Sequence, residues 1–244
     1  DIQRQLAKSN AQLAQLNEEK NHFLGVAAHD LRNPLHSILL MSEFLMDEVH
    51  GEEQREFLVE IRNSSQFMAK LLDDLLDVTR IESGGVKLDY TPVDLNQLAR
   101  HNVQRNQVLA QRKDVRLSLE GHLNDVVIAD EAKLEQMLNN LITNAVKFST
   151  EGSRVLVRLT DAEPNFVCQV QDWGSGIPPE IQQHLFTPFR KGQTGTAGEK
   201  STGLGLTIVK RIVEAHRGTI EFESVPGEGT TFTVTIPCEP DQYR

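Results

Sequence analysis

The chain has 244 residues, of which 39% are hydrophobic, and it carries 25 Lys and Arg against 35 Asp and Glu. This length suits one large domain or two ordinary ones, and the net charge of −10 argues against binding to nucleic acid or to an anionic membrane surface. The two cysteines, Cys168 and Cys238, do not have the spacing of a disulfide framework or a zinc site, which favours a reducing compartment. No stretch approaches the about 20 consecutive apolar residues of a spanning helix, so we expect a cytoplasmic location, although a membrane anchor could precede this segment.

Residues 1–22 contain no Gly or Pro and are rich in helix-forming side chains. They follow a sparse heptad repeat, which predicts a coiled-coil linker that continues from a sensor domain outside this sequence. The repeat changes phase by one residue between Lys20 and Leu24, and we expect an upstream signal to act by altering the register there. The members of the repeat are Leu6, Ser9, Leu13, Leu16, Lys20 and Phe23.

Two stronger runs of alternating four- and three-residue steps follow, over residues 24–49 and 57–78, and the sequence HGEE separates them. They predict two long helices joined by a short turn, in a hairpin over residues 23–83. Because so narrow a hairpin has little interior of its own, we expect two copies to form a homodimeric four-helix bundle. The seam residues are Leu24, Ala28, Leu31, Leu35, Ile38, Ser42, Leu45 and Val49, and then Phe57, Ile61, Ser64, Met68, Leu71, Leu75 and Val78.

Ser83-Gly84-Gly85 ends the second helix, since glycine readily closes helices, and we place the domain boundary at residues 83–92. Beyond it, over residues 92–238, helical and strand patterns interleave. They predict an α/β sandwich with a mixed sheet and helices on one face, so the whole chain is of the α plus α/β class. The predicted helices are 93–113, 129–149 and 206–216, and the predicted strands are 115–121, 154–160, 166–173, 218–224 and 230–237.

The motif HDLRNPL, residues 29–35, places a histidine and a carboxylate next to the helical seam. Neutral imidazole is a competent nucleophile, and Asp30 could orient the ring of His29 and accept its proton. Asn33 lies one turn later and could hold a water molecule. An exposed histidine without a catalytic role fits the same observation.

Three further motifs lie in the second domain. In NNLITNAVKFS, residues 139–149, Asn140, Asn144 and Lys147 share one helix face, which suits Mg²⁺ and phosphate groups but also suits a solvated helix surface. In DWGSGIP, residues 172–178, glycines permit close approach of a flat ligand, although such turns are often plain hairpins. The polar, glycine-containing run of residues 187–206 leads into a helix and suggests a lid and an anion site.

In this order, the motifs HDLRNPL, N-L-x-x-N-A-x-K-F, D-x-G-x-G-I, F-x-P-F and G-L-G-L resemble those of the two-component sensor histidine kinases. The resemblance covers residues 17–238. It implies a dimerisation and histidine phosphotransfer domain followed by a Bergerat-type ATP-binding domain. It also implies autophosphorylation of His29 with Mg²⁺ and ATP, activation by Asp30, and transfer to an aspartate of a response regulator. Asn33 matches the position associated with phosphatase activity.

The resemblance also implies the nucleotide contacts. Asn144 corresponds to the Mg²⁺ ligand, and Asp172 corresponds to the carboxylate that reads adenine. Trp173 departs from the family, in which this position is commonly smaller or polar, and we expect it to affect nucleotide stacking. The other nucleotide-binding positions are expected to be Asn140, Lys147, Phe148, Gly174, Gly176, Ile177, Phe189, Arg190, Gly203, Leu204, Gly205, Leu206 and Thr231.

Two alternatives belong to other functional classes. The chain could be a Bergerat-fold ATPase. Such ATPases are similar to one another in having a glutamate general base at the position of Asn140, however, and an amide cannot take a proton from water. It could also be a degenerate kinase that serves only as a dimerisation scaffold, although the expected polar groups are present. Labelling from γ-labelled ATP distinguishes the three classes.

Overall fold

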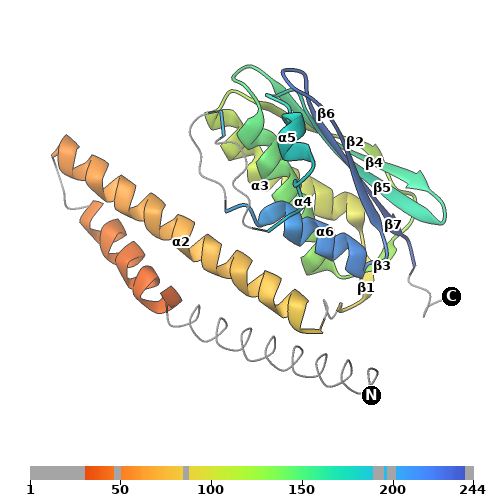
Figure 1. Ribbon diagram of the computed structural model, residues 1–244, viewed down its shortest axis with the longest axis horizontal. Helices are drawn as coiled ribbons and strands as arrows, with labels where there is room; N and C mark the ends of the chain where they lie inside the picture. Colours follow the sequence, from red (N-terminus) through yellow and green to blue (C-terminus); the bar gives the residue numbers. More distant parts are fainter. Residues whose placement is uncertain (1–30, 47–50, 85–87, 189–194, 197–201, 240–244) are drawn as a thin grey trace, which may run out of the picture. The chain divides into compact units, whose positions relative to one another are not determined.

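The computed structural model describes residues 31–46, 51–84, 88–188, 195–196 and 202–239 (Figure 1). The chain divides into two compact units, residues 1–85 and 86–244. The expected coiled coil of residues 1–22 lies outside the described residues. So do His29, Asp30, Phe189 and Arg190.

The first unit is a helical hairpin, as the heptad pattern predicted. Residues 31–46 are helical, and α2 (Glu52–Gly84) forms the second arm. An ion pair between Arg32 and Asp73 joins the two helices near the end that carries the HDLRNPL motif. Glu52 and Glu53 lie in the first turn of α2, where carboxylates favour the positive end of the helix dipole.

The hairpin buries a different face from the one that the heptad runs emphasised. On α2, residues spaced by seven are buried, namely Leu58, Ser65, Leu72 and Thr79. Several apolar members of the predicted seam, on both helices, are instead exposed in the single chain, whereas Ser42 and Val78 of the seam are buried. The exposed members are Leu31, Ile38, Leu45, Phe57, Ile61 and Met68, with exposed fractions between 43% and 62%.

The second unit is built on a five-stranded mixed sheet in the order β2-β4-β5-β7-β6 (Figure 1). Strands β2 and β4 are parallel and the other neighbours are antiparallel. The strands are β2 (Arg116–His122), β4 (Arg154–Ala162), β5 (Asn165–Asp172), β6 (Thr219–Val225) and β7 (Gly229–Pro237).

Three helices cover one face of this sheet, as expected: α3 (Leu95–Arg112), α4 (Glu131–Phe148) and α6 (Gly205–Ala215) (Figure 1). Alternate residues of β5, from Phe166 to Asp172, are buried on the helix side, whereas their neighbours lie half-buried on the other face. Asp94 and Asp130 cap α3 and α4 by accepting the backbone N–H of Gln97 and Lys133.

Three short elements were not predicted. Strands β1 (Thr91–Val93) and β3 (Val127–Ala129) pair as a small antiparallel sheet, and α5 (Pro179–Gln182) is a single turn. Elements of three or four residues carry no periodicity that a sequence pattern can reveal. Within the described ranges, no helix combines the length and the hydropathy that crossing a membrane requires.

Candidate functional site

One face of α4 carries the asparagines that the sequence singled out. Asn140 is buried, and Asn144 and Lys147 are half-buried, each about one turn from the last. The start of α6 lies against this face. A β-carbon built on Gly205 would be 3.7 Å from Oδ1 of Asn140 and 4.0 Å from Nδ2 of Asn144.

The N-terminus of α6 has the properties of an anion site. Its N-cap residue, Leu204, is buried and its side chain provides no hydrogen bond to the first turn, while the Leu204 N–H donates to the hydroxyl of Thr202 at 3.3 Å. Gly203, just before it, has a φ of +72°, which glycine adopts without strain. Together with Asn140 and Asn144, this helix end can bind phosphate oxygens.

Asp172, at the end of β5, is a buried carboxylate with only 5% of its surface exposed. Burial raises the pKa of this carboxyl to about 6, and hydrogen bonds from the backbone of Gly174 and Thr230 partly oppose the rise. The Gly174 N–H donates to Oδ1 at 3.0 Å, so the carboxylate is oriented by the turn that follows it.

The glycines of this turn allow it to pass the end of α4 closely. A β-carbon on Gly174 would lie 2.2 Å from the carbonyl oxygen of Phe148, and Ser175 N–H donates to that same oxygen at 3.0 Å. Gly176 has a φ of +63°, and a β-carbon built on it would lie 2.1 Å from the carbonyl oxygen of Val225. The DWGSGIP turn therefore meets the C-terminal end of α4, the helix that carries the asparagines.

A described residue of the run 187–206, Thr196, is held at the same helix end. Thr196 donates its N–H to the carbonyl of Lys147 at 3.2 Å and its hydroxyl to the carbonyl of Ser149 at 2.6 Å. The ammonium group of Lys113 also donates to the Lys147 carbonyl. The Lys147 ammonium lies 5.2 Å from the centre of the Phe148 ring. Thr196 lies within the run of residues 187–206 but was not singled out there, and Lys113 belongs to no motif.

Among the predicted site residues that the structure describes in this unit, Thr231 lies on the opposite face of the sheet from Asp172. It pairs with Gln171, whereas Asp172 pairs with Thr230, so the side chain of Thr231 leaves the sheet on the face opposite to Asp172. Thr230 is buried beside Asp172, and its hydroxyl lies 2.9 Å from that of Ser224. The alternation along β7, read in register with β5, is the signal that distinguishes the two threonines.

The remaining predicted residues lie as follows. Leu206, in the first turn of α6, and Ile177, after the glycine turn, are half-buried, and the Ile177 N–H donates to the hydroxyl of Ser224 at 2.8 Å. Asn33 is exposed in the helix of residues 31–46. It belongs to the first unit.

Comparisons with known proteins agree with this domain organisation. Residues 19–84 match the family model "His Kinase A (phospho-acceptor) domain". Residues 129–240 match the model "Histidine kinase-, DNA gyrase B-, and HSP90-like ATPase". The two matches lie on either side of the boundary between the two units.

Individual relatives are similar over nearly the whole chain. The circadian input-output histidine kinase CikA of Synechococcus elongatus is 38% identical over 91% of this chain, and the autoinducer 2 sensor kinase/phosphatase LuxQ of Vibrio parahaemolyticus is 32% identical over 96%. These matches span 30% and 29% of the length of the two relatives.

Solved structures show the same arrangement of elements. Full-length ShkA in complex with AMPPNP matches with a TM-score of 0.74 and 29% identity, over 88% of this chain and 45% of that one. The Acinetobacter baumannii histidine kinase AdeS matches with a TM-score of 0.63 and 25% identity, over 86% of this chain and 98% of that one. The chain therefore belongs to the two-component sensor histidine kinases, and it comprises the phospho-acceptor and ATPase domains of their core.

Proposed function

We propose that the chain binds ATP with Mg²⁺, transfers the γ-phosphoryl group to His29, and passes it to an aspartate of a response regulator. The observation that carries the proposal is the convergence of Asn140 and Asn144 with the N-terminus of α6, close to the buried carboxylate of Asp172. This arrangement offers polar groups for phosphate oxygens and one acceptor for a base. AMPPNP, with which ShkA was crystallised, is an ATP analogue that such a site would hold.

The donor set suits Mg²⁺ bound mainly through phosphate. Asn144 supplies an amide oxygen, a hard ligand of the kind that Mg²⁺ takes. In the parts of the chain that the structure describes, no group of three or more His, Cys, Asp or Glu side chains could hold a metal by itself. When bound, the ion would neutralise charge on the phosphates, and Lys147 would add to this neutralisation.

The base end of the site is supplied by β5 and β7. We assign Asp172 as the acceptor for the exocyclic amine of adenine and add Thr230, instead of Thr231, as its neighbour. The hydroxyls of Thr230 and Ser224 lie 2.9 Å apart, and Ser224 in turn contacts the carbonyl of Gly229 and the N–H of Ile177. This chain of hydrogen bonds holds the floor of the site together, and Phe148 is assigned to the ring of the base.

Phosphoryl transfer requires little covalent chemistry from the protein. Its main needs are a nucleophile in line with the γ-phosphate and neutralisation of the negative charge on that phosphate. We assign His29 as the nucleophile and Asp30 as the carboxylate that orients it. Asn33, exposed on the next turn, is assigned to a phosphatase activity in which its amide positions water. The name of LuxQ, a sensor kinase/phosphatase, supports this assignment.

We also propose that two copies pair through the open apolar stripe of the hairpin, with the linker before it receiving a signal from an upstream sensor. The stripe includes Ile38, Leu45, Ile61 and Met68, which are 43% to 47% exposed in one copy. Burial of such a stripe removes apolar surface from water, which is the main driving force for association. A second hairpin supplies the matching surface, since the stripe occurs on both copies.

Labelling from γ-³²P-ATP tests the catalytic proposal. Wild-type protein should acquire acid-labile, base-stable label, and His29→Gln should acquire none while its affinity for ATP stays nearly unchanged. His36→Gln is a matched control, because His36 lies seven residues further along the helix and is exposed. Release of free phosphate without labelled protein would support the ATPase alternative, and neither product would support the scaffold alternative.

A further inference from the structure

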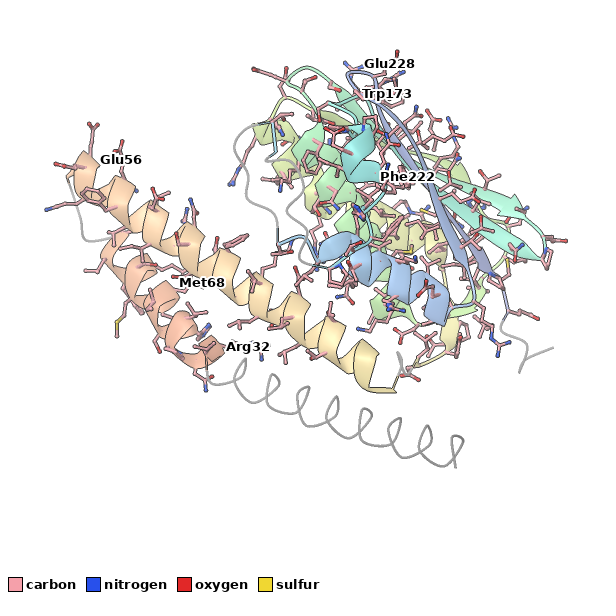
Figure 2. The ribbon with its side chains drawn as sticks, viewed as in Figure 1. Arg32, Glu56, Met68, Trp173, Phe222 and Glu228 are labelled. Carbon is pink, nitrogen blue, oxygen red and sulfur yellow. The ribbon has the colours of Figure 1, made fainter. Side chains whose placement is uncertain are left out.

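Trp173 follows Asp172 directly, and the two side chains leave the sheet on opposite faces. Asp172 lies on the face that the helices cover. On β4, Val155 is buried on the same face, so Arg154, the residue before it, lies on the open face. Trp173 contacts Arg154 and therefore also lies on the open face. Figure 2 labels Trp173 at the end of the sheet. The indole is therefore not available to stack on a nucleotide held beside Asp172.

Two consecutive residues at the start of β4, Ser153 just before the strand and Arg154 at its first position, hold Trp173 in three ways. The guanidinium carbon of Arg154 lies 3.8 Å from the centre of the indole ring, within the range of a cation–π contact. The Trp173 N–H donates to the Arg154 carbonyl at 3.4 Å, and the Ser153 hydroxyl donates to the Trp173 carbonyl at 2.8 Å. Both backbone groups and the side chain of Trp173 are thus fixed from the β4 side.

The stack also gives Arg154 a favourable position. Arg154 pairs in register with Arg116 of β2, and like charges directly opposite one another destabilise a sheet. The indole follows β5, which lies on the side of β4 opposite to β2. By stacking on the indole, the Arg154 guanidinium is therefore drawn away from β2 and from Arg116.

The peptide held in this way is the one that orients the Asp172 carboxylate. The peptide bond after Trp173 carries the Gly174 N–H that donates to Oδ1 of Asp172. On the β7 side there is no space for the segment to shift, since a β-carbon on Gly229 would lie only 2.1 Å from the Asp172 carbonyl and 2.9 Å from Cα of Trp173. The contacts with Ser153 and Arg154 hold the other side of the segment, so loss of the Arg154 stack frees it toward β4 and shifts the N–H that aims the carboxylate.

We infer that Arg154 is a positioning residue which, through Trp173, orients Asp172 from the opposite face of the sheet and so sets the preference of the kinase for adenine over guanine. The inference rests on the proposed role of Asp172 as the acceptor for the adenine amine. Guanine has an oxygen where adenine has that amine, so a misaligned acceptor reduces the discrimination between the two bases.

The test compares Arg154→Leu with Arg158→Leu in the full chain. Arg158 lies four residues further along β4 on the same face and pairs with Glu120, away from the tryptophan, so it is a matched control. We expect Arg154→Leu to weaken ATP binding about three- to ten-fold while GTP binding changes little, as measured by calorimetry. The rate of labelling at saturating ATP should stay near that of the wild type, because the phosphate contacts are intact. Arg158→Leu should leave both affinities unchanged.

Trp173 is the sole tryptophan, so its emission spectrum reports the stack directly. The spectrum should shift in Arg154→Leu and not in Arg158→Leu, and Arg154→Lys, which keeps a cation over the ring, should restore most of the ATP preference. A shifted spectrum with an unchanged ratio of ATP to GTP affinity would overturn the inference, and so would an equal loss of both affinities. If Arg154→Leu fails to fold, Arg154→Gln serves in its place. If Asp172→Asn leaves the ATP to GTP ratio unchanged, the proposed role of Asp172 fails instead.

Discussion

Replacing Asp172 by Asn should stabilise the ligand-free protein and at the same time weaken ATP binding. The carboxyl is 5% exposed, and its burial raises its pKa from 3.8 to about 6. A shift of this size means that keeping the Asp172 carboxyl ionised lowers the free energy of unfolding by at most about 3 kcal/mol, relative to a neutral group at this position. The amide has nearly the same shape, can still accept the Gly174 N–H, and carries no charge to desolvate.

The sign of the pH dependence follows from the direction of the shift. Because the folded state binds the Asp172 proton more tightly than the unfolded state does, the stability of the wild type falls as pH rises from about 4 to about 6, and it stays lower above that range. The gain in the Asn variant should therefore be small at pH 4, roughly half of its maximum at pH 5, and complete from about pH 7 upward. The affinity of the Asn variant for ATP should fall by about ten-fold or more, since the charge-assisted hydrogen bond to the adenine amine is lost.

Urea denaturation at pH 5 and pH 8, followed by the emission of Trp173, measures this effect. The single tryptophan lies in the unit of residues 86–244, so its signal reports the unfolding of the unit that contains Asp172. Asp125→Asn removes the same charge from an exposed position and should leave the unfolding free energy nearly unchanged. A gain that is equal at both pH values, or a loss of stability at pH 8, would refute the reasoning.

Four further results are expected. Asn144→Ala should weaken binding of Mg-ATP at least about ten-fold by calorimetry, because a hard ligand is lost, and unchanged affinity would show that this face of α4 was misassigned. Asn33→Ala should keep autophosphorylation but slow dephosphorylation of the regulator, and an equal loss of both activities would indicate a structural role. Met68→Glu, which puts a charge on the open stripe of α2, should shift the protein from dimer to monomer in analytical ultracentrifugation, whereas Lys70→Glu should not. Residues inserted one at a time within segment 9–16 of the full-length protein should make kinase output vary with a period of seven, and a smooth decline would exclude control by register.

Periodicity predicted the long elements of this chain well because each of them buries one continuous face. The limits of α4 and β7 differ from the predicted ranges by two residues or fewer. The fold class, a helical N-terminal region followed by a mixed sheet with helices on one face, is confirmed. The short strands β1 and β3 were missed, since their pairing depends on chain segments about 35 residues apart and not on a local pattern.

Which face of the hairpin is buried within one chain could not be read from the heptads alone. A seam that packs inside a hairpin and a seam that packs against a second copy have the same four-three spacing. In the structure, Leu58 and Leu72 are buried, whereas Phe57 and Met68 of the predicted seam are exposed. The additional apolar residues that widen the stripe of α2 therefore mark a second packing face.

The sequence by itself determined the residue types of the site and their order along the chain. The spacing of Asn140, Asn144 and Lys147 places them on one helix face in any helix, because the period of 3.6 residues is a local property. Only the tertiary structure decided which groups meet across elements. The register between β5 and β7 makes Thr230, instead of Thr231, the neighbour of Asp172, and the packing of α6 against α4 brings Gly205 to the asparagines. Register and helix packing depend on burial of the entire sheet face, which no short motif encodes.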